Sequence, residues 1–178
     1  KIQEIKKVCL KWNLPIIEDA AEALGSKIKI DDKFTHCGCF GDIGTLSFNG
    51  NKIITSGGGG ALLTDNDKFG TLGRHLSNTA KVEHPWDFYH DHIGWNDRLP
   101  NVNAAIGFAE MEKINAKLRA KRTLHSKFRK NFEDLNNVEI ICESTNCESN
   151  YWLITLRLIG ENVESLRDEI LNNANKLK

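Results

Sequence analysis

The sequence predicts an α/β fold followed by a smaller α+β part, and two stretches indicate this most directly. Residues 2–13 carry apolar side chains at helical spacing and lead through a short link into the apolar run 15–17. A helix followed at once by a strand is typical of a parallel sheet. The stretch 41–65, GDIGTLSFNGNKIITSGGGGALLTD, has the pattern of strand, tight turn, lysine, glycine run and strand. We therefore expect a large α/β part over residues 1–115 and a small α+β part over residues 116–178.

The other elements follow from the same apolar periodicities. The strand at Pro15–Ile17 is expected to be buried and to end at Glu18-Asp19, and a helix should begin at Asn66 or Asp67. Residues 77–98 are expected to form a long irregular loop, which in a compact domain is more often functional than idle. The remaining expectations are strands at 26–30, 34 onward, 45–48, 61–64, 138–142 and 151–158, and helices over 66–75, from Pro100 through about 130, and over 165–177.

Composition narrows the class of protein. Lys+Arg and Asp+Glu number 24 each, so there is no excess charge for binding nucleic acid or an anionic membrane. The basic run 117–130 is interpreted as a solvated helix face. No apolar run approaches the roughly 18 residues of a membrane-spanning helix. The five cysteines are odd in number and irregularly spaced, which favours reduced thiols in a cytoplasmic protein.

Histidines and cysteines give only weak hints of a metal. Cys37-Gly-Cys39 is too short for the usual zinc-binding pair, although His36 lies beside it. His84, His90 and His92 fit no standard ligand spacing. We therefore expect no metal site.

Lys52 is the first candidate for chemistry. It lies between the turn Asn49-Gly50-Asn51 and the glycines 57–60, where backbone alone would hold its amine in place for attack on a carbonyl. The alternative is a β-hairpin with a surface lysine. Asp19 follows a predicted strand, at the edge where open α/β sheets bind ligands. Asp19 could equally cap the following turn at residues 20–24.

Three segments together resemble one family. They are EDAAEALGS (18–26), FGDIGTLSFNGNKIITSGGGGALLTDN (40–66) and HIGWNDRLPNVNAAIGFAEMEKI (92–114), and they are similar to the DegT/DnrJ/StrS-type sugar aminotransferases. The wording FNGNKIIT is most similar to members that act in bacillosamine, legionaminic acid and other surface-polysaccharide pathways. This resemblance implies a fold-type I large domain, with a mostly parallel sheet covered by helices on both faces, and a smaller α+β domain. Family members are longer, so we expect this chain to be the C-terminal half of the large domain and a truncated small domain.

The resemblance implies a role for each matching residue. Lys52 matches the lysine that forms the internal aldimine with pyridoxal 5′-phosphate (PLP), and Asp19 matches the aspartate that pairs with the pyridine nitrogen. Ser47 matches the serine that binds the cofactor phosphate. Asn96 matches an asparagine that reaches the phosphate of the neighbouring subunit's cofactor, which implies a homodimer. Glu22 stands where the family generally has a glutamine near the cofactor's phenolic oxygen.

By resemblance, the chain would transfer an amine from an amino acid, glutamate by expectation, to a nucleotide-linked keto-sugar. The main alternative is a non-catalytic fragment or a regulatory, sugar-binding homologue that keeps the fold without turnover. A PLP dehydratase of the same family would carry histidine in place of Lys52, which speaks against it. A general α/β interaction domain is the remaining alternative.

Overall fold

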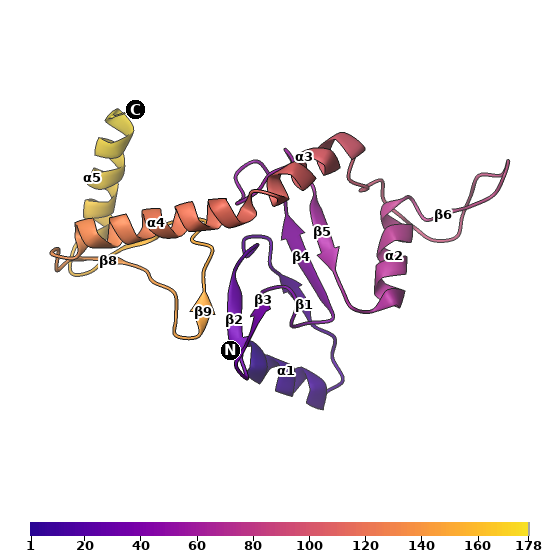
Figure 1. The fold of residues 1–178 in the computed structure, drawn as a ribbon, viewed down its shortest axis with the longest axis horizontal. Coiled ribbons are helices and arrows are strands. Elements are labelled where there is room, and N and C mark those ends of the chain that lie inside the picture. The colour runs from indigo at the N-terminus through magenta and orange to yellow at the C-terminus, as the bar shows by residue number, and fades with distance from the viewer. Residues whose placement is uncertain (178) are drawn as a thin grey trace.

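A three-stranded sheet in the order β1-β4-β5 lies at the centre of the computed structural model, which describes residues 1–177 (Figure 1). β1 (Ile17–Asp19) runs parallel to β4 (Ile43–Ser47), and β5 (Gly60–Leu63) runs antiparallel to β4. In this register Asp19 lies opposite Thr45, so β1 and β4 end at the same edge of the sheet. The expected strands at 45–48 and 61–64 are thus confirmed to within two residues.

The prediction for the first strand was wrong in position and in burial. β1 begins at Ile17 and includes Glu18 and Asp19, and Ile17 is 70% exposed. The side chain of Asp42 accepts the backbone N–H of Ile16 at 2.7 Å, so regular pairing with β4 begins only at the next residue. β1 is the outer strand of the described sheet, which leaves Ile17 uncovered.

Two helices flank this sheet in the sequence as expected. α1 (Ile2–Lys11) precedes β1, and α2 (Asp67–Ser77) follows β5. Asn66 caps α2, because its side-chain oxygen accepts the backbone N–H of Lys68 at 2.9 Å and that of Phe69 at 3.4 Å. The cap predicted from the sequence is confirmed at this residue.

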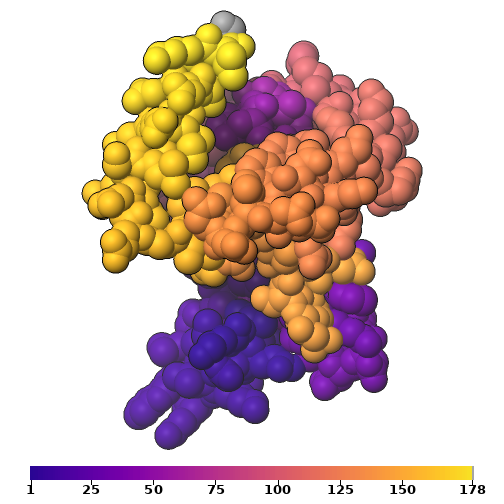
Figure 2. All heavy atoms as spheres, turned by 90° about the vertical axis from the view of Figure 1, so that its left-hand side faces the viewer, coloured from indigo at the N-terminus to yellow at the C-terminus, as the bar shows by residue number. Residues whose placement is uncertain are grey.

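A second sheet brings together strands that lie far apart in the sequence. β2 (Lys27–Ile30) and β3 (Lys33–His36) form the expected hairpin, and β9 (Cys147–Glu148) pairs antiparallel with β2. Figure 2 shows this later segment, in light orange, reaching down to the N-terminal part of the molecule. The pairing of β2 with β9 crosses the predicted domain boundary near residue 115, and this boundary stays a prediction.

The sequence predicted a long irregular loop after α2, but part of this segment is regular. It forms a hairpin of two short strands, β6 (Lys81–Val82) and β7 (Tyr89–His90), which projects from the end of α2 (Figure 1). At the base of this hairpin, hydrogen bonds with His92 and His75 lower the pKa of Asp91 to about 2. Asp91 is therefore ionised throughout the neutral pH range.

The C-terminal part consists of helices around a small antiparallel ladder. α3 (Asn101–Met111) begins after Pro100, and α4 (Ile114–Phe132) continues in nearly the same direction (Figure 1). β8 (Val138–Ile140) pairs antiparallel with β10 (Leu156–Leu158), and α5 (Val163–Lys176) follows. No helix within residues 1–177 is long and apolar enough to cross a membrane.

The expected strand at 151–158 was wrong for its first half. Tyr151 has a left-handed backbone, with φ of 45°, which a strand does not accommodate. Its neighbours bond locally instead, because Asn150 Oδ1 accepts the N–H of Trp152 at 2.9 Å and Ser149 Oγ accepts that of Tyr151 at 3.1 Å. Only Leu156–Leu158 forms strand.

Part of the basic run 117–130 is structural rather than solvated. His125 is buried and stacks on Tyr151, with ring centroids 3.7 Å apart. Arg122 forms a two-pronged pair with Glu143, through nitrogen–oxygen distances of 2.9 Å and 2.6 Å. This pair attaches α4 to the segment that follows β8.

Asn150 fastens the same segment to the N-terminal part. Its side-chain amide is 4% exposed and donates to the backbone oxygens of Glu22, at 2.7 Å, and Leu24, at 3.0 Å. Its own backbone N–H donates to Ser26 Oγ at 3.0 Å.

Replacing Asn150 with alanine should destabilise the fold. The change leaves the part-buried backbone oxygens of Glu22 and Leu24 without this donor. A fully buried unsatisfied group costs about 1–3 kcal/mol, so we expect a loss toward the lower end of that range. Urea unfolding followed by circular dichroism would measure the loss. Asn173→Ala, on the exposed face of α5, is the matched control and should cause no comparable loss. Equal stabilities of the two variants would contradict this account.

The Arg122–Glu143 pair should make stability depend on pH. The hydrogen bond from Arg122 holds the pKa of Glu143 below its ordinary 4.5, so the pair's contribution is present above that value and is lost as pH falls through the lowered one. Glu143→Gln should therefore be less stable than the wild type at neutral pH, and this difference in stability should narrow as the pH falls below 4.5. A gap that does not change with pH would show that the charge of Glu143 is not involved.

Candidate active site

Asp19 and Ser47 lie at the carboxyl ends of two strands that pair in parallel. Asp19 is the last residue of β1 and Ser47 the last of β4. Asp19 Oδ1 accepts the backbone N–H of Ala21 at 3.1 Å, so the capping role that the sequence left open is present. Ser47 Oγ accepts the N–H of Asn49 at 3.3 Å. A carboxylate and a hydroxyl thus share the sheet edge where α/β proteins bind ligands.

Lys52 follows β4 in a tight turn that fixes its backbone. Its N–H donates to Asn49 O at 3.1 Å, and the next two residues, Ile53 and Ile54, are buried and anchor the chain. The side chain of Lys52 is only 13% exposed. Its amine therefore extends from a fixed base rather than into open solvent.

Two groups surround the amine of Lys52. Glu22 Oε1 lies 3.2 Å from Nζ, and the ring of Trp152 has its centroid 4.2 Å from Nζ. The indole attracts the ammonium through its electron-rich face, and the carboxylate does so by charge. Because the side chain of Glu22 is 64% exposed, the ion pair is screened by solvent.

The contact of Glu22 with Lys52 is not one that the sequence indicated. By resemblance, Glu22 occupies a position near the cofactor's phenolic oxygen, where a second negative charge would be unfavourable. In this structure the carboxylate contacts the lysine amine, an opposite charge.

The glycine run closes the loop between Lys52 and β5. Gly57 and Gly59 have φ of 81° and 84°, a conformation that side chains with a Cβ rarely adopt. A Cβ at Gly59 would also lie 2.4 Å from the side chain of Leu99. The buried Ser56 holds the run, since its Oγ donates to Gly58 O at 2.6 Å and its carbonyl accepts from Asn103 of α3 at 2.6 Å. The expected backbone freedom is present at Gly57 and Gly59, and the expected close approach is present at Gly59.

Sequence reasoning missed Trp152. Its indole Nε1 donates to Asn51 O at 2.5 Å, and its own carbonyl accepts from Lys121 Nζ at 3.1 Å. Trp152 lies 100 residues after Lys52, inside a run that reads as a strand, so no local pattern connects the two.

Asn96 is not brought to this edge. It is exposed and forms an isolated bridge with Asn78 at the end of α2. Three of the histidines considered from the sequence have hydrogen-bond partners elsewhere. Gly25 donates to His36 Nε2 at 2.7 Å, His90 Nδ1 lies 2.8 Å from Thr79 O, and His84 accepts from the N–H of Asp87 at 2.9 Å.

The residues at this edge fit PLP by their chemistry. PLP requires an amine for its carbonyl carbon, a carboxylate for its pyridinium and donors for its phosphate. Lys52, Asp19 and Ser47 are groups of these three kinds. Asp19 and Ser47 end the parallel strands β1 and β4, and Lys52 lies in the turn after β4. The set contains no group that PLP chemistry would exclude.

The family model and the relatives that match this chain agree on one protein family. Residues 1–177 match the model of the DegT/DnrJ/EryC1/StrS aminotransferase family. The chain is 37% identical over 158 residues to EpsN of Bacillus subtilis (strain 168), covering 89% of this chain and 39% of that protein. It is 35% identical over 170 residues to GDP-perosamine synthase of Escherichia coli O157:H7, covering 95% of this chain and 45% of the synthase. The chain thus spans less than half the length of these relatives.

Solved structures show the same fold. Helicobacter pylori PseC, an aminotransferase involved in the biosynthesis of pseudoaminic acid, superposes with a TM-score of 0.87 at 21% identity. The match covers 99% of this chain and 46% of that one. A DegT DnrJ EryC1 StrS aminotransferase from Brucella abortus has a TM-score of 0.82 at 23% identity, with coverage of 98% and 44%.

The ring of Trp152 should shield the Lys52 amine from reagents in solution. With an amine-acylating reagent, we expect Lys52 to react slowly in the wild type and several-fold faster in Trp152→Ala, because the ring no longer covers Nζ. Mass spectrometry of the peptide that contains Lys52 would give the rates. Exposed Lys127 serves as the internal reference, and Trp12→Ala, which removes a 66% exposed tryptophan, as the matched variant. Unchanged labelling of Lys52 in Trp152→Ala would refute the shielding.

Proposed function

The chain belongs to the DegT/DnrJ/EryC1/StrS aminotransferase family, and on this premise we propose that it is the lysine-bearing part of a PLP-dependent sugar aminotransferase. The observation that carries the proposal is Lys52. Its amine extends from a fixed turn beside the carboxyl edge of β1 and β4, and its side chain is 13% exposed. A non-catalytic relative would have no need to keep a lysine in this position.

We assign the cofactor-binding roles to the residues of this edge. Lys52 supplies the amine that joins the cofactor's carbonyl carbon, and Asp19 holds the proton on its pyridine nitrogen. The hydroxyl of Ser47 binds the phosphate. PLP, when bound, supplies the electron sink for the substrate's carbon. Glu22 Oε1 lies 3.2 Å from the Lys52 amine, so its carboxylate would lie beside the atom through which Lys52 holds the cofactor.

Lys52 is also the group suited to moving a proton. With its Nζ free, Lys52 would take a proton from the substrate carbon as general base and would deliver that proton to the cofactor as general acid. The neighbours of Nζ serve this role because the ring of Trp152 and the turn at Asn49 restrict where the amine can lie. A restricted amine stays within reach of the carbon on which it acts.

The proposed substrates are a nucleotide-linked keto-sugar as acceptor and an amino acid, glutamate, as donor. Support comes from the relatives, which include GDP-perosamine synthase and, at 26% identity, a dTDP-4-amino-4,6-dideoxy-D-glucose transaminase of Shigella dysenteriae. These names describe those proteins. Because this chain spans less than half of their length, the sugar acceptor is proposed as a class only.

We further propose a cytoplasmic homodimer. The five cysteines are free thiols, as reducing compartments maintain them. Asn96 lies on an exposed segment away from the elements that carry Lys52, so it can serve a partner's site rather than its own.

Covalent trapping tests the role of Lys52. The purified chain would be mixed with PLP, reduced with borohydride and digested, and we expect the cofactor mass on the peptide that contains Lys52. Lys52→Ala should lose this label, while Lys127→Ala, at an exposed lysine of α4, should keep it. Label distributed over exposed lysines, with none at Lys52, would falsify the assignment.

A further inference from the structure

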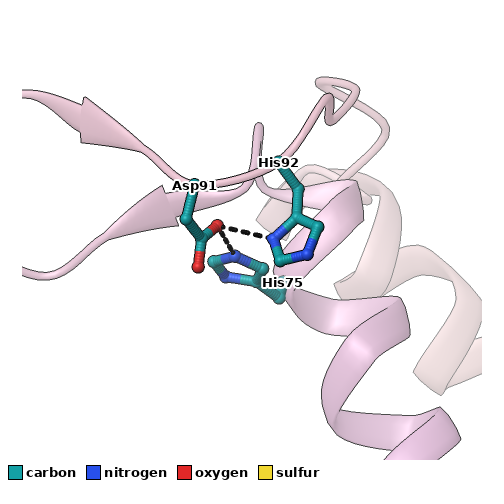
Figure 3. A group of neighbouring side chains, drawn as sticks. All are labelled: His75, Asp91 and His92. Atoms are coloured by element: carbon teal, nitrogen blue, oxygen red, sulfur yellow. Dashed lines mark hydrogen bonds and ion pairs between the residues drawn. The ribbon is translucent and has the colours of Figure 1, made fainter.

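Three side chains at the base of the β6–β7 hairpin converge on one point. His75 comes from the last turn of α2, and Asp91 and His92 follow β7, as Figure 3 shows. Asp91 Oδ1 lies 2.5 Å from His75 Nε2 and 3.0 Å from His92 Nδ1. The ligand atoms of all three residues lie within 4.8 Å of one another.

We propose that His75, Asp91 and His92 bind a divalent transition-metal ion of the Zn²⁺ class. The proposal is independent of the aminotransferase function, since none of the three residues takes part in the site around Lys52. Two imidazoles and one carboxylate are ligands that Zn²⁺ and its borderline neighbours prefer, whereas Mg²⁺ and Ca²⁺ prefer oxygen ligands alone.

The distances are close to those that such an ion requires. Zinc lies about 2.0–2.1 Å from each nitrogen or oxygen ligand, so tetrahedral ligand atoms are roughly 3.3 Å apart. The two separations of 2.5 Å and 3.0 Å need to widen by less than 1 Å, which small rotations of the side chains supply. The imidazoles would carry their protons on the nitrogens that face away from Asp91, and the lone pairs on the facing nitrogens would bind the ion.

The backbone around the three residues is already fixed. Trp95 N–H donates to Leu76 O at 2.7 Å, Thr79 N–H donates to Trp95 O at 2.9 Å, and Ala80 N–H donates to His75 O at 2.9 Å. These bonds attach the segment after β7 to the end of α2. A Cβ at Gly94 would lie 2.5 Å from Ala80 N, so only glycine permits the approach. Binding of the ion would therefore need to order little of this backbone.

The cluster is open to solvent on one side. The side chains of His75, Asp91 and His92 are 28%, 36% and 60% exposed. A hollow of about 560 Å³, lined in part by Asp67, Leu72, His75 and Asp91, lies alongside. An ion can therefore enter, and water can complete its coordination.

Zinc titration of the chelator-treated 178-residue chain by calorimetry tests the proposal. We expect one ion per chain in the wild type. Loss of even an outer-shell partner weakens metal sites about 10–100-fold, so His75→Ala/His92→Ala should weaken binding by at least that much. His84→Ala/His90→Ala removes two histidines of the same segment that lie outside the cluster, and it should bind as the wild type does. Excess Mg²⁺ should not compete.

Two further measurements keep the test decisive. Circular dichroism would verify that the variants fold. If His75→Ala/His92→Ala does not fold, His92→Gln replaces it, because His92 is the most exposed of the three residues. His92→Gln should also weaken zinc binding about tenfold or more. The proposal is overturned if the wild type does not bind zinc at about millimolar concentration. It is equally overturned if the cluster variants and the control His84→Ala/His90→Ala bind zinc alike. Loss of zinc binding in Cys37→Ser/Cys39→Ser would also overturn it, because the ion would then lie at the cysteine pair.

Discussion

The parallel pairing of β1 with β4 places Asp19 and Ser47 at one edge of the sheet, and Lys52 follows in the turn after β4. Successive residues of a strand point to opposite faces, and parallel strands end together, so this pairing determines which side chains can meet. Gly44 makes the pairing possible in its present form. A Cβ there would lie 1.9 Å from Gly38 O, so β4 can pass the preceding segment only with glycine at this position.

The fixed lysine also depends on a segment from the far end of the chain. Asn150 and Trp152 attach to backbone oxygens of Glu22, Leu24 and Asn51, so the loop before β10 covers the loops that surround Lys52. The pairing of β9 with β2 strengthens the same attachment. The environment of the amine is therefore built jointly by the α/β part and the α+β part.

Local patterns were enough to predict much of the fold. Helical spacing located α1, α2 and α5, turn residues located the β2–β3 hairpin, and the cap at Asn66 was predictable from its residue type. Among the candidate site residues, Lys52 and Asp19 were singled out by local patterns, and Ser47 came from the family resemblance. Trp152 and the partner of Glu22 could not be predicted in this way, because they depend on contacts across about 30 to 100 residues. His75 escaped notice as a neighbour of His92 because the β6–β7 hairpin separates them in the sequence. Tyr151 has a backbone conformation that the strand-like pattern of its neighbours conceals.

The ring of Trp152 should also make the intrinsic fluorescence of the chain sensitive to the charge of Lys52. The emission of an indole changes when a charge near its ring appears or disappears, and the amine of Lys52 lies 4.2 Å from the centroid of this ring. Trp12, Trp86 and Trp95 are each more than half exposed, so their emission is that of indoles in contact with solvent and forms the background. Any event that alters the charge of Lys52 should thus register in the intrinsic fluorescence of the molecule, without an attached dye.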